Sequence, residues 1–419
     1  MNMRKHILAC LALALLASCS NSGTEKETVE KNNPKTEVKK EVKSQTKPKK
    51  QLAMPVLDMN LRYPKKIVDL QDIADVEYIV LETHDDGLVS GSFNTTITDS
   101  LIITYNMSND ILFFHRDGRF SHSFNRKGGS GKEYSTISQK LCVNPEQKEI
   151  YIYESARGRI QIYSFDGQYK RTLKVRGDGY EYGTLFYIDS EFLLLEDLKY
   201  VDYYENPQPT NPKPYYRLTV ADGSKQQLPL MVEKRIHNSF NWHIKETGKF
   251  ASIGVSISPV ANIGGELIIS DFALDTVYAY KDERLVPIAR KVNWMKKSGV
   301  PWLVTLDAIT DKYYLWHAVE KDAKKMVWPD KTFLQDRYTG ECTQIKLADK
   351  NITDKKYRFR HRASANLFTP PKGSIMQYYP AYRLVELYKE GKLQGELKKI
   401  ASKLGEDDNP VLMLAKFKE

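Results

Sequence analysis

The feature that most constrains this fold is a tight-turn signal that returns at long and similar intervals. Asp-Gly pairs stand between short β-rich runs at positions 117, 166 and 222, and Asp282-Glu283 and Thr339-Gly340 occupy the same place in later units. Successive turns are 49, 56, 60 and 57 residues apart. Asp-Gly favours a tight hairpin because glycine readily adopts the positive φ that such a turn needs. A period of roughly 50 residues with about four strands per unit is typical of a β-propeller.

A β-sandwich is the second interpretation, but it would show turns about every 8–12 residues without a longer period. Five propeller units hold the hairpins, at about residues 92–125, 137–176, 184–231, 250–292 and 303–348. A sixth unit must join the N-terminal strand at Ile67–Leu81 to a strand at Val411–Phe417, which closes the ring and removes free sheet edges. Tyr382–Tyr388 and Leu393–Leu404 have apolar residues three and four apart, which predicts two short helices packed against the ring.

Several segments carry a resemblance to a known family. They are VEYIVLET (Val76–Thr83), FNRKGGSGKEY (Phe124–Tyr134), IYIYESARGRIQIYSFDG (Ile150–Gly167), ISDFALDTVYAY (Ile269–Tyr280) and NPVLMLAKFK (Asn409–Lys418). Over about residues 65–419 the chain resembles the six-bladed β-propeller lipoproteins of the Bacteroidetes, which are related to NHL-repeat propellers. The resemblance implies an all-β, six-bladed propeller in the cell envelope. It implies no activity, because the family has none in common.

The first 18 residues predict a lipoprotein signal peptide. Arg4 and Lys5 precede the apolar run Ile7–Leu16, and Leu16-Ala17-Ser18-Cys19 resembles the bacterial lipobox. Cys19 is therefore the expected lipid attachment site, the alternative being an ordinary signal peptide with a chance cysteine. The expected location is the outer membrane, with the periplasmic and the surface side both left open.

Residues 19–51 predict a flexible tether, and residues 52–419 the propeller. Ser20–Lys50 is rich in Lys, Glu, Thr and Asn and has no aromatic residue, so it cannot bury enough apolar surface to fold. The leader and the tether hold much of the net charge of +10, and the rest gives no argument for nucleic acid as a partner. Cys142 and Cys342 are expected to be buried thiols rather than a disulfide.

Propeller geometry sorts the loops onto two faces. The Asp-Gly turns share one face; the links between blades, and the loops between second and third strands, share the other, called here the link face. Ligands of propellers usually bind on the link face. The ligand-binding candidates on it are Arg126, Glu133, Tyr134, Glu154, Arg157, Tyr180, Tyr203, Tyr204, Trp242, His243, Asp271 and Trp316.

The aromatic candidates favour a binding function. Tyr and Trp rings stack on sugars or extended peptides, although some of this set, such as Tyr215 and Tyr216, could instead pack within the sheet. Gly128–Lys132 lacks the flanking residues of a phosphate-binding loop, and the sequence has no HExxH or GxSxG motif.

Three functions remain open at this point. The first is a non-catalytic binding module for a glycan, a peptide or a partner protein, anchored to the membrane and needing no metal or cofactor. The second resembles the metal-dependent lactonases, lyases and esterases built on six-bladed rings, with Glu154, Asp271, His237 and His243 as candidate ligands of calcium or zinc. The third is a purely structural role in an envelope complex.

Overall fold

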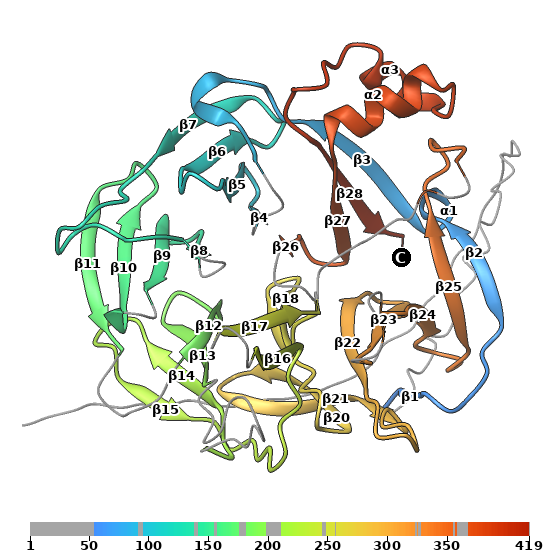
Figure 1. Ribbon diagram of the computed structural model, residues 1–419, viewed down its shortest axis with the longest axis horizontal. Coiled ribbons are helices and arrows are strands. Elements are labelled where there is room, and N and C mark those ends of the chain that lie inside the picture. The colour runs from blue at the N-terminus through green and yellow to red at the C-terminus, as the bar shows by residue number, and fades with distance from the viewer. Residues whose placement is uncertain are drawn as a thin grey trace, which may run out of the picture. The chain divides into compact units, whose positions relative to one another are not determined.

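The computed structural model describes residues 54–90, 95–137, 141–154, 157–175, 182–197, 211–244, 249–255, 257–322, 325, 328–354, 357 and 368–418. In these residues, six β-sheets stand around a central channel as the blades of a propeller (Figure 1). The predicted six-bladed, all-β fold is therefore confirmed. The predicted signal peptide, the lipidated Cys19 and the tether lie outside the described residues.

Blades 1 to 5 each take four strands in chain order from the channel outward (Figure 1). Blade 1 contains β4 (Thr95–Ile97), β5 (Leu101–Tyr105), β6 (Ile111–His115) and β7 (Phe120–Phe124); blade 2 contains β8 (Leu141–Asn144), β9 (Glu149–Glu154), β10 (Arg159–Ser164) and β11 (Tyr169–Lys174). Blade 3 contains β12 (Tyr182–Tyr187), β13 (Phe192–Asp197), β14 (Tyr215–Thr219) and β15 (Lys225–Gln227). Blade 4 contains β18 (Val260–Ile263), β19 (Glu266–Ile269), β20 (Thr276–Lys281) and β21 (Arg284–Val292); blade 5 contains β22 (Trp302–Ile309), β23 (Tyr313–Glu320), β24 (Asp330–Asp336) and β25 (Cys342–Ala348).

Blade 6 closes the ring with strands from both ends of the chain. In it, β28 (Val411–Phe417) pairs antiparallel with β27 (Ser374–Tyr379) on one side and with β3 (Ala74–Val80) on the other. The predicted closure is confirmed, but the predicted N-terminal strand was too long. Its first residues form β2 (Lys65–Asp69), which belongs to the sheet of blade 5, and the short helix α1 (Leu70–Ile73) separates β2 from β3.

Three short strands complete the sheets at their edges. Outside the ring, β1 (Val56–Asp58) pairs in parallel with β21 of blade 4, and β2 pairs in parallel with β25 of blade 5. At the channel, β26 (Phe368–Thr369) pairs in parallel with β4. The N-terminal segment thus covers two outer sheet edges, which would otherwise offer unpaired backbone groups to another chain.

The link between blades 3 and 4 holds a hairpin that the sequence analysis assigned in part to blade 4. The hairpin strands β16 (Ser239–Ile244) and β17 (Lys249–Gly254) form a separate two-stranded sheet, so blade 4 begins at β18 rather than near residue 250. Phe240 of β16 stacks on Trp328, with ring centroids 5.4 Å apart, and thereby joins the hairpin to the loop between β23 and β24.

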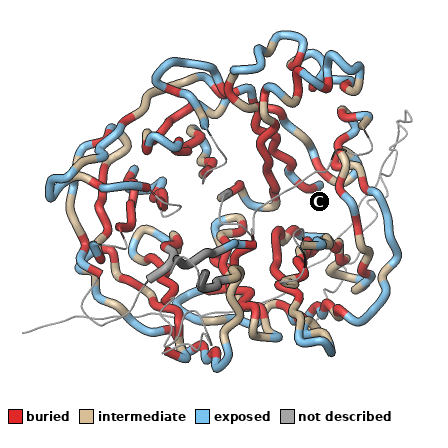
Figure 2. The backbone as a smooth tube through the Cα atoms, in the orientation of Figure 1, coloured by how far each residue is buried: buried red, intermediate tan, exposed pale blue. Residues whose placement is uncertain are grey.

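The apolar core is divided into wedges between neighbouring blades, which appear as buried segments around the ring (Figure 2). Ile103 and Phe113 of blade 1, for example, pack with Ile150 of blade 2. The helices α2 (Ala381–Lys389) and α3 (Gly395–Ala401) pack on the wedge between blades 5 and 6, which confirms their prediction. Cys142 and Cys342 are buried free thiols, as expected.

The predicted Asp-Gly turns also connect neighbouring blades. Gly118 has a φ of +91°, and its carbonyl accepts a hydrogen bond from the backbone N–H of Glu82 at 2.9 Å, just beyond the outer strand of the preceding blade. A Cβ atom at Gly118 would lie only 2.1 Å from the carbonyl oxygen of Val80. Gly167 repeats the contact in the next blade, where its carbonyl accepts a hydrogen bond from Arg126 Nε at 2.8 Å.

We predict that Gly118→Ala lowers the free energy of unfolding by clearly more than Gly391→Ala. Gly391 also has a positive φ (+68°), but a Cβ there would meet open space. Its substitution should therefore cost only the backbone strain of about 1–2 kcal/mol, whereas Gly118→Ala adds a clash with the neighbouring blade. Denaturant unfolding of the two variants measures the difference, and equal losses would show that the turn does not hold the blades together.

Candidate functional site

The link from blade 1 to blade 2 brings together five of the residues predicted to bind ligand. Glu154 is buried there, and its carboxylate accepts hydrogen bonds from Arg159 Nε at 2.6 Å and from Ser135 Oγ at 2.9 Å. Arg157 lies 3.5 Å from Oε1, the oxygen that also accepts the Ser135 bond. Arg159 in turn donates to the carbonyl of Glu133 at 2.9 Å. These bonds hold the glycine-rich turn at residues 126–134 in place. Glu154 therefore has a structural role that the sequence analysis did not foresee.

Within the same turn, Tyr134 offers no ring to a ligand. It is 0% exposed, it donates to the carbonyl of Asn109 at 2.8 Å, and its ring packs edge-on against Tyr163. Burial raises the pKa of Tyr134 to about 12. The Glu133 carboxylate accepts the backbone N–H of Ser130 at 2.8 Å, which lowers the pKa of that carboxyl. The prediction of Tyr134 as a ligand-binding residue is wrong, because the hydrophobic wedge between blades 1 and 2 takes up its ring.

Trp316 is the second wrong prediction. Its side chain is 0% exposed in the wedge between blades 4 and 5, and its indole N–H donates to Gln335 Oε1 at 3.0 Å. Tyr215 and Tyr216 are buried in β14, as the alternative interpretation of these residues had it. Trp316, Tyr215 and Tyr216 lie on strands at positions that point into the packing between blades, so their aromatic side chains are buried.

The other aromatic candidates cannot be placed in the same way. Tyr180, Tyr203 and Tyr204 lie outside the described residues. Trp242 and His243 belong to β16, where Trp242 pairs with Ala251 and His243 with Phe250 in the backbone register, but their side chains also lie outside the described part of the chain. An aromatic surface on the link face therefore stays a prediction.

Asp271 belongs to a buried polar network beneath the link face of blades 3 and 4. Its Oδ2 accepts a hydrogen bond from the hydroxyl of Tyr215 at 2.6 Å, and its Oδ1 accepts the backbone N–H of Ala273 at 3.0 Å. Close by, Arg235 forms an almost fully buried ion pair with Glu196. Burial raises the pKa of Glu196 in spite of Arg235. Sequence reasoning missed Glu196 and Arg235, which lie 39 positions apart and carry no motif.

Two buried bases complete this network. The ammonium of Lys291, 0% exposed, donates to the carbonyls of Ser270, Asp271 and Val304 at 3.1, 2.8 and 2.8 Å. Burial lowers the pKa of Lys291 to about 7, but three carbonyl acceptors match the three N–H bonds of the charged form and favour it. Burial also lowers the pKa of His237 to about 4, which leaves its imidazole neutral at neutral pH. In the described parts of the chain, no three His, Cys, Asp or Glu side chains gather in a way that could hold a metal ion.

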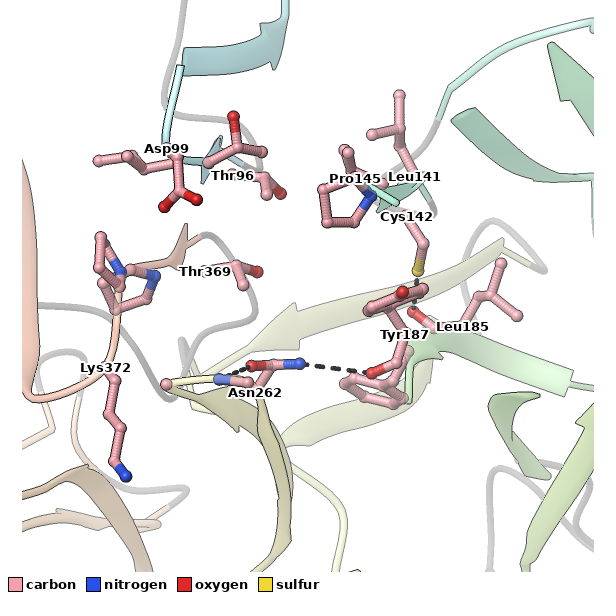
Figure 3. Close-up of a pocket in the computed structure, with 18 residues that line it drawn as sticks. Thr96, Asp99, Leu141, Cys142, Pro145, Leu185, Tyr187, Asn262, Thr369 and Lys372 are labelled. Atoms are coloured by element: carbon pink, nitrogen blue, oxygen red, sulfur yellow. Dashed lines mark hydrogen bonds between the residues drawn. The ribbon is translucent and has the colours of Figure 1, made fainter. Parts of the chain in front are cut away.

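A cavity of about 310 Å³ lies at the other end of the channel. We call this side of the ring the turn face, because it carries the turns between first and second strands at residues 98–100, 145–148, 264–265 and 310–312. Five segments of the chain line this channel cavity (Figure 3): Thr96–Asp99, Leu141–Val143 with Pro145, Leu185–Tyr187, Asn262 with Gly264 and Gly265, and Thr369–Lys372. The sequence analysis expected ligands on the opposite face.

The walls of the channel cavity are mostly apolar, and a few polar groups are fixed in them. Asn262 accepts the backbone N–H of Gly265 at 2.9 Å and donates to the carbonyl of Tyr187 at 3.4 Å, so its amide is held in one orientation (Figure 3). The Cys142 thiol donates to the carbonyl of Leu185 at 3.2 Å, and burial raises its pKa to about 12, so it is not a ready nucleophile. This combination of apolar walls and a few oriented polar groups is typical of a ligand pocket.

In the described residues, no helix is both long enough and apolar enough to cross a membrane. No curated protein sequence matches this chain. Among solved structures, the chain is similar to a putative exported protein from Bacteroides fragilis, with a TM-score of 0.61 and 12% identity over 87% of this chain and 100% of the other. It is also similar to a member of the DUF4221 family from Bacteroides vulgatus, with a TM-score of 0.50 and 10% identity over 83% of this chain and 99% of the other.

At such low identities the likeness shows the six-bladed fold and nothing more. A virginiamycin B lyase from Staphylococcus aureus aligns with a TM-score of only 0.30 and 9% identity, over 64% of this chain and 97% of the lyase, which carries no argument about activity. The family model described as "Domain of unknown function (DUF4934)" matches residues 55–416, which include all six blades. The chain therefore belongs to the DUF4934 family.

Proposed function

We propose that this protein is a non-catalytic binding module of the cell envelope that takes its ligand into the channel cavity on the turn face. The observation that carries the proposal is a cavity of about 310 Å³ with apolar walls and an oriented amide. That volume falls within the range of about 300–1,000 Å³ usual for small-ligand sites. A glycan, a short peptide or a loop of a partner protein fits this chemistry.

The acidic side chains singled out for chemistry support binding rather than catalysis. Glu154 is occupied by Arg159 and Ser135, and Asp271 by Tyr215 and a backbone N–H. A general base or a metal ligand needs an oxygen that faces the substrate, whereas these oxygens are used within the fold. The channel cavity, by contrast, is open space between rigid strands.

The envelope location rests on the leader and on one neighbour. The leader ends in Leu16-Ala17-Ser18-Cys19, which resembles a lipobox. The structure from Bacteroides fragilis, which is similar over 87% of this chain, is itself described as a putative exported protein. Acyl chains on Cys19 would hold the propeller at the outer membrane, and residues 20–51 would act as a tether that lets it stand away from the membrane surface.

We predict that Thr369→Trp abolishes binding to whatever ligand glycan and peptide arrays identify. Thr369 lines the channel cavity, and an indole there would fill much of it. Thr339→Trp, on an exposed turn of blade 5, is the matched control and should bind as the wild type does. Isothermal titration with the identified ligand measures both affinities. If Thr369→Trp binds normally and Trp242→Ala does not, the ligand site lies on the link face instead.

We also predict that Cys19→Ala abolishes the incorporation of radioactive palmitate, because without the thiol no acyl chain can be attached at this position. Labelling of growing cells measures the incorporation. Label on the variant would contradict the lipoprotein assignment, and Cys10→Ala serves as the control.

A further inference from the structure

A second cavity on the turn face has a chemical character of its own. Its volume is about 500 Å³, and it lies where blades 4, 5 and 6 meet. We call it the basic cavity. Its lining residues come from the turns of blades 4 and 5, from the approach to β27 and from the C-terminal end of β28: Ile263, Glu266, Lys281, Ile288, Ile309–Asp311, Tyr314, Arg337, Lys372, Gly373 and Lys416–Lys418.

Cationic side chains outnumber carboxylates in the basic cavity by five to two. Glu266 is neutralised by Lys281, whose amino group lies 2.7 Å away. Lys372 and Lys416 are exposed, and neither forms an ion pair with any residue that the structure describes. An excess of positive charge in a cavity attracts an anion from solution.

Arg337 adds a positive charge that is held in position. Its guanidinium packs on the ring of Tyr314, 4.9 Å from the centroid, and one terminal nitrogen donates to the carbonyl of Thr310. These contacts fix the guanidinium in the wall of the basic cavity.

We propose that the basic cavity binds the acidic group of a saccharide, a carboxylate or a sulfate. This inference rests on the proposed function, because the saccharide would extend from the channel cavity into the basic cavity. Lys372 lines both cavities. Its side chain extends away from the other labelled residues of the channel cavity (Figure 3).

The two carboxylates of the basic cavity favour a saccharide over an acidic peptide. Asp311 would repel a ligand that carries only negative charge, because like charges in one site disfavour each other. Both carboxylates, Glu266 and Asp311, accept hydrogen bonds from hydroxyl groups, which a sugar acid or a sulfated sugar supplies beside its anionic group. An acidic peptide has no comparable set of hydroxyls.

Isothermal titration of the purified protein tests the proposal with four probes: trigalacturonic acid for a carboxylate, a sulfated heparin disaccharide for a sulfate, maltotriose as the neutral sugar and triglutamate as the acidic peptide. We expect at least one acidic saccharide to bind, and maltotriose and triglutamate to bind at least tenfold more weakly. Lys416→Gln and Lys372→Gln should each weaken the acidic saccharide about tenfold, because each removes one charge-assisted contact. Lys403→Gln, an exposed lysine beyond α3, is the control and should have no effect.

The proposal is overturned if neither acidic saccharide binds, if triglutamate binds equally well, or if both lysine variants bind like the wild type. The Thr369→Trp variant separates this inference from the proposed function. Acidic saccharide binding that survives Thr369→Trp and is weakened about tenfold in Lys416→Gln supports the basic cavity and contradicts the channel site. Binding that is lost in Thr369→Trp and unchanged in both lysine variants supports the channel site and contradicts the basic cavity.

Discussion

One buried carboxylate joins the two ends of the chain where the ring closes. Asp349, just beyond β25, accepts hydrogen bonds from the hydroxyls of Tyr78 in β3 and Tyr379 in β27 at 2.8 and 2.9 Å, and from the amide of Gln71 at 2.7 Å. The partners come from blade 6 and from the N-terminal segment, 271 and 278 positions away in the case of Tyr78 and Gln71. Burial beside this carboxylate raises the pKa of Tyr78, so the hydroxyl stays a donor.

Both cavities follow from this closure. The strand β28 can stand beside β3 only when the chain ends meet, and its last residues then form one wall of the basic cavity. The segment 370–373 between β26 and β27 contributes lining residues to both cavities. On the link face, by contrast, polar groups such as Glu154 and Asp271 are used to hold turns and neighbouring strands. Both faces therefore carry contacts that join neighbouring blades, and the cavities of our proposal lie on the turn face.

The sequence alone predicts the ring but not its site, and the reason is physical. Asp-Gly turns and the β28 pattern are local signals, so blade count, hairpins and closure follow from them. The exposure of a side chain depends on segments that are distant in the sequence. The sequence around Trp316 indicates a strand but not which of its residues are buried, and the packing of blade 4 against blade 5 buries this tryptophan. The ion pair of Glu196 with Arg235 and the basic cavity are assembled from distant segments that have no shared motif. The sequence of β17 resembles that of a blade strand, and the sequence analysis therefore places its residues at the start of blade 4.

The central claim is that this ring binds its ligand on the turn face. Hydrogen exchange of the backbone amides, with and without saturating trigalacturonic acid, tests this claim without any substitution. The account predicts slower exchange at residues 262–266, 309–311 and 416–418, which line the two cavities. Slower exchange confined to the glycine-rich turn at residues 126–134, or in no segment, would contradict it.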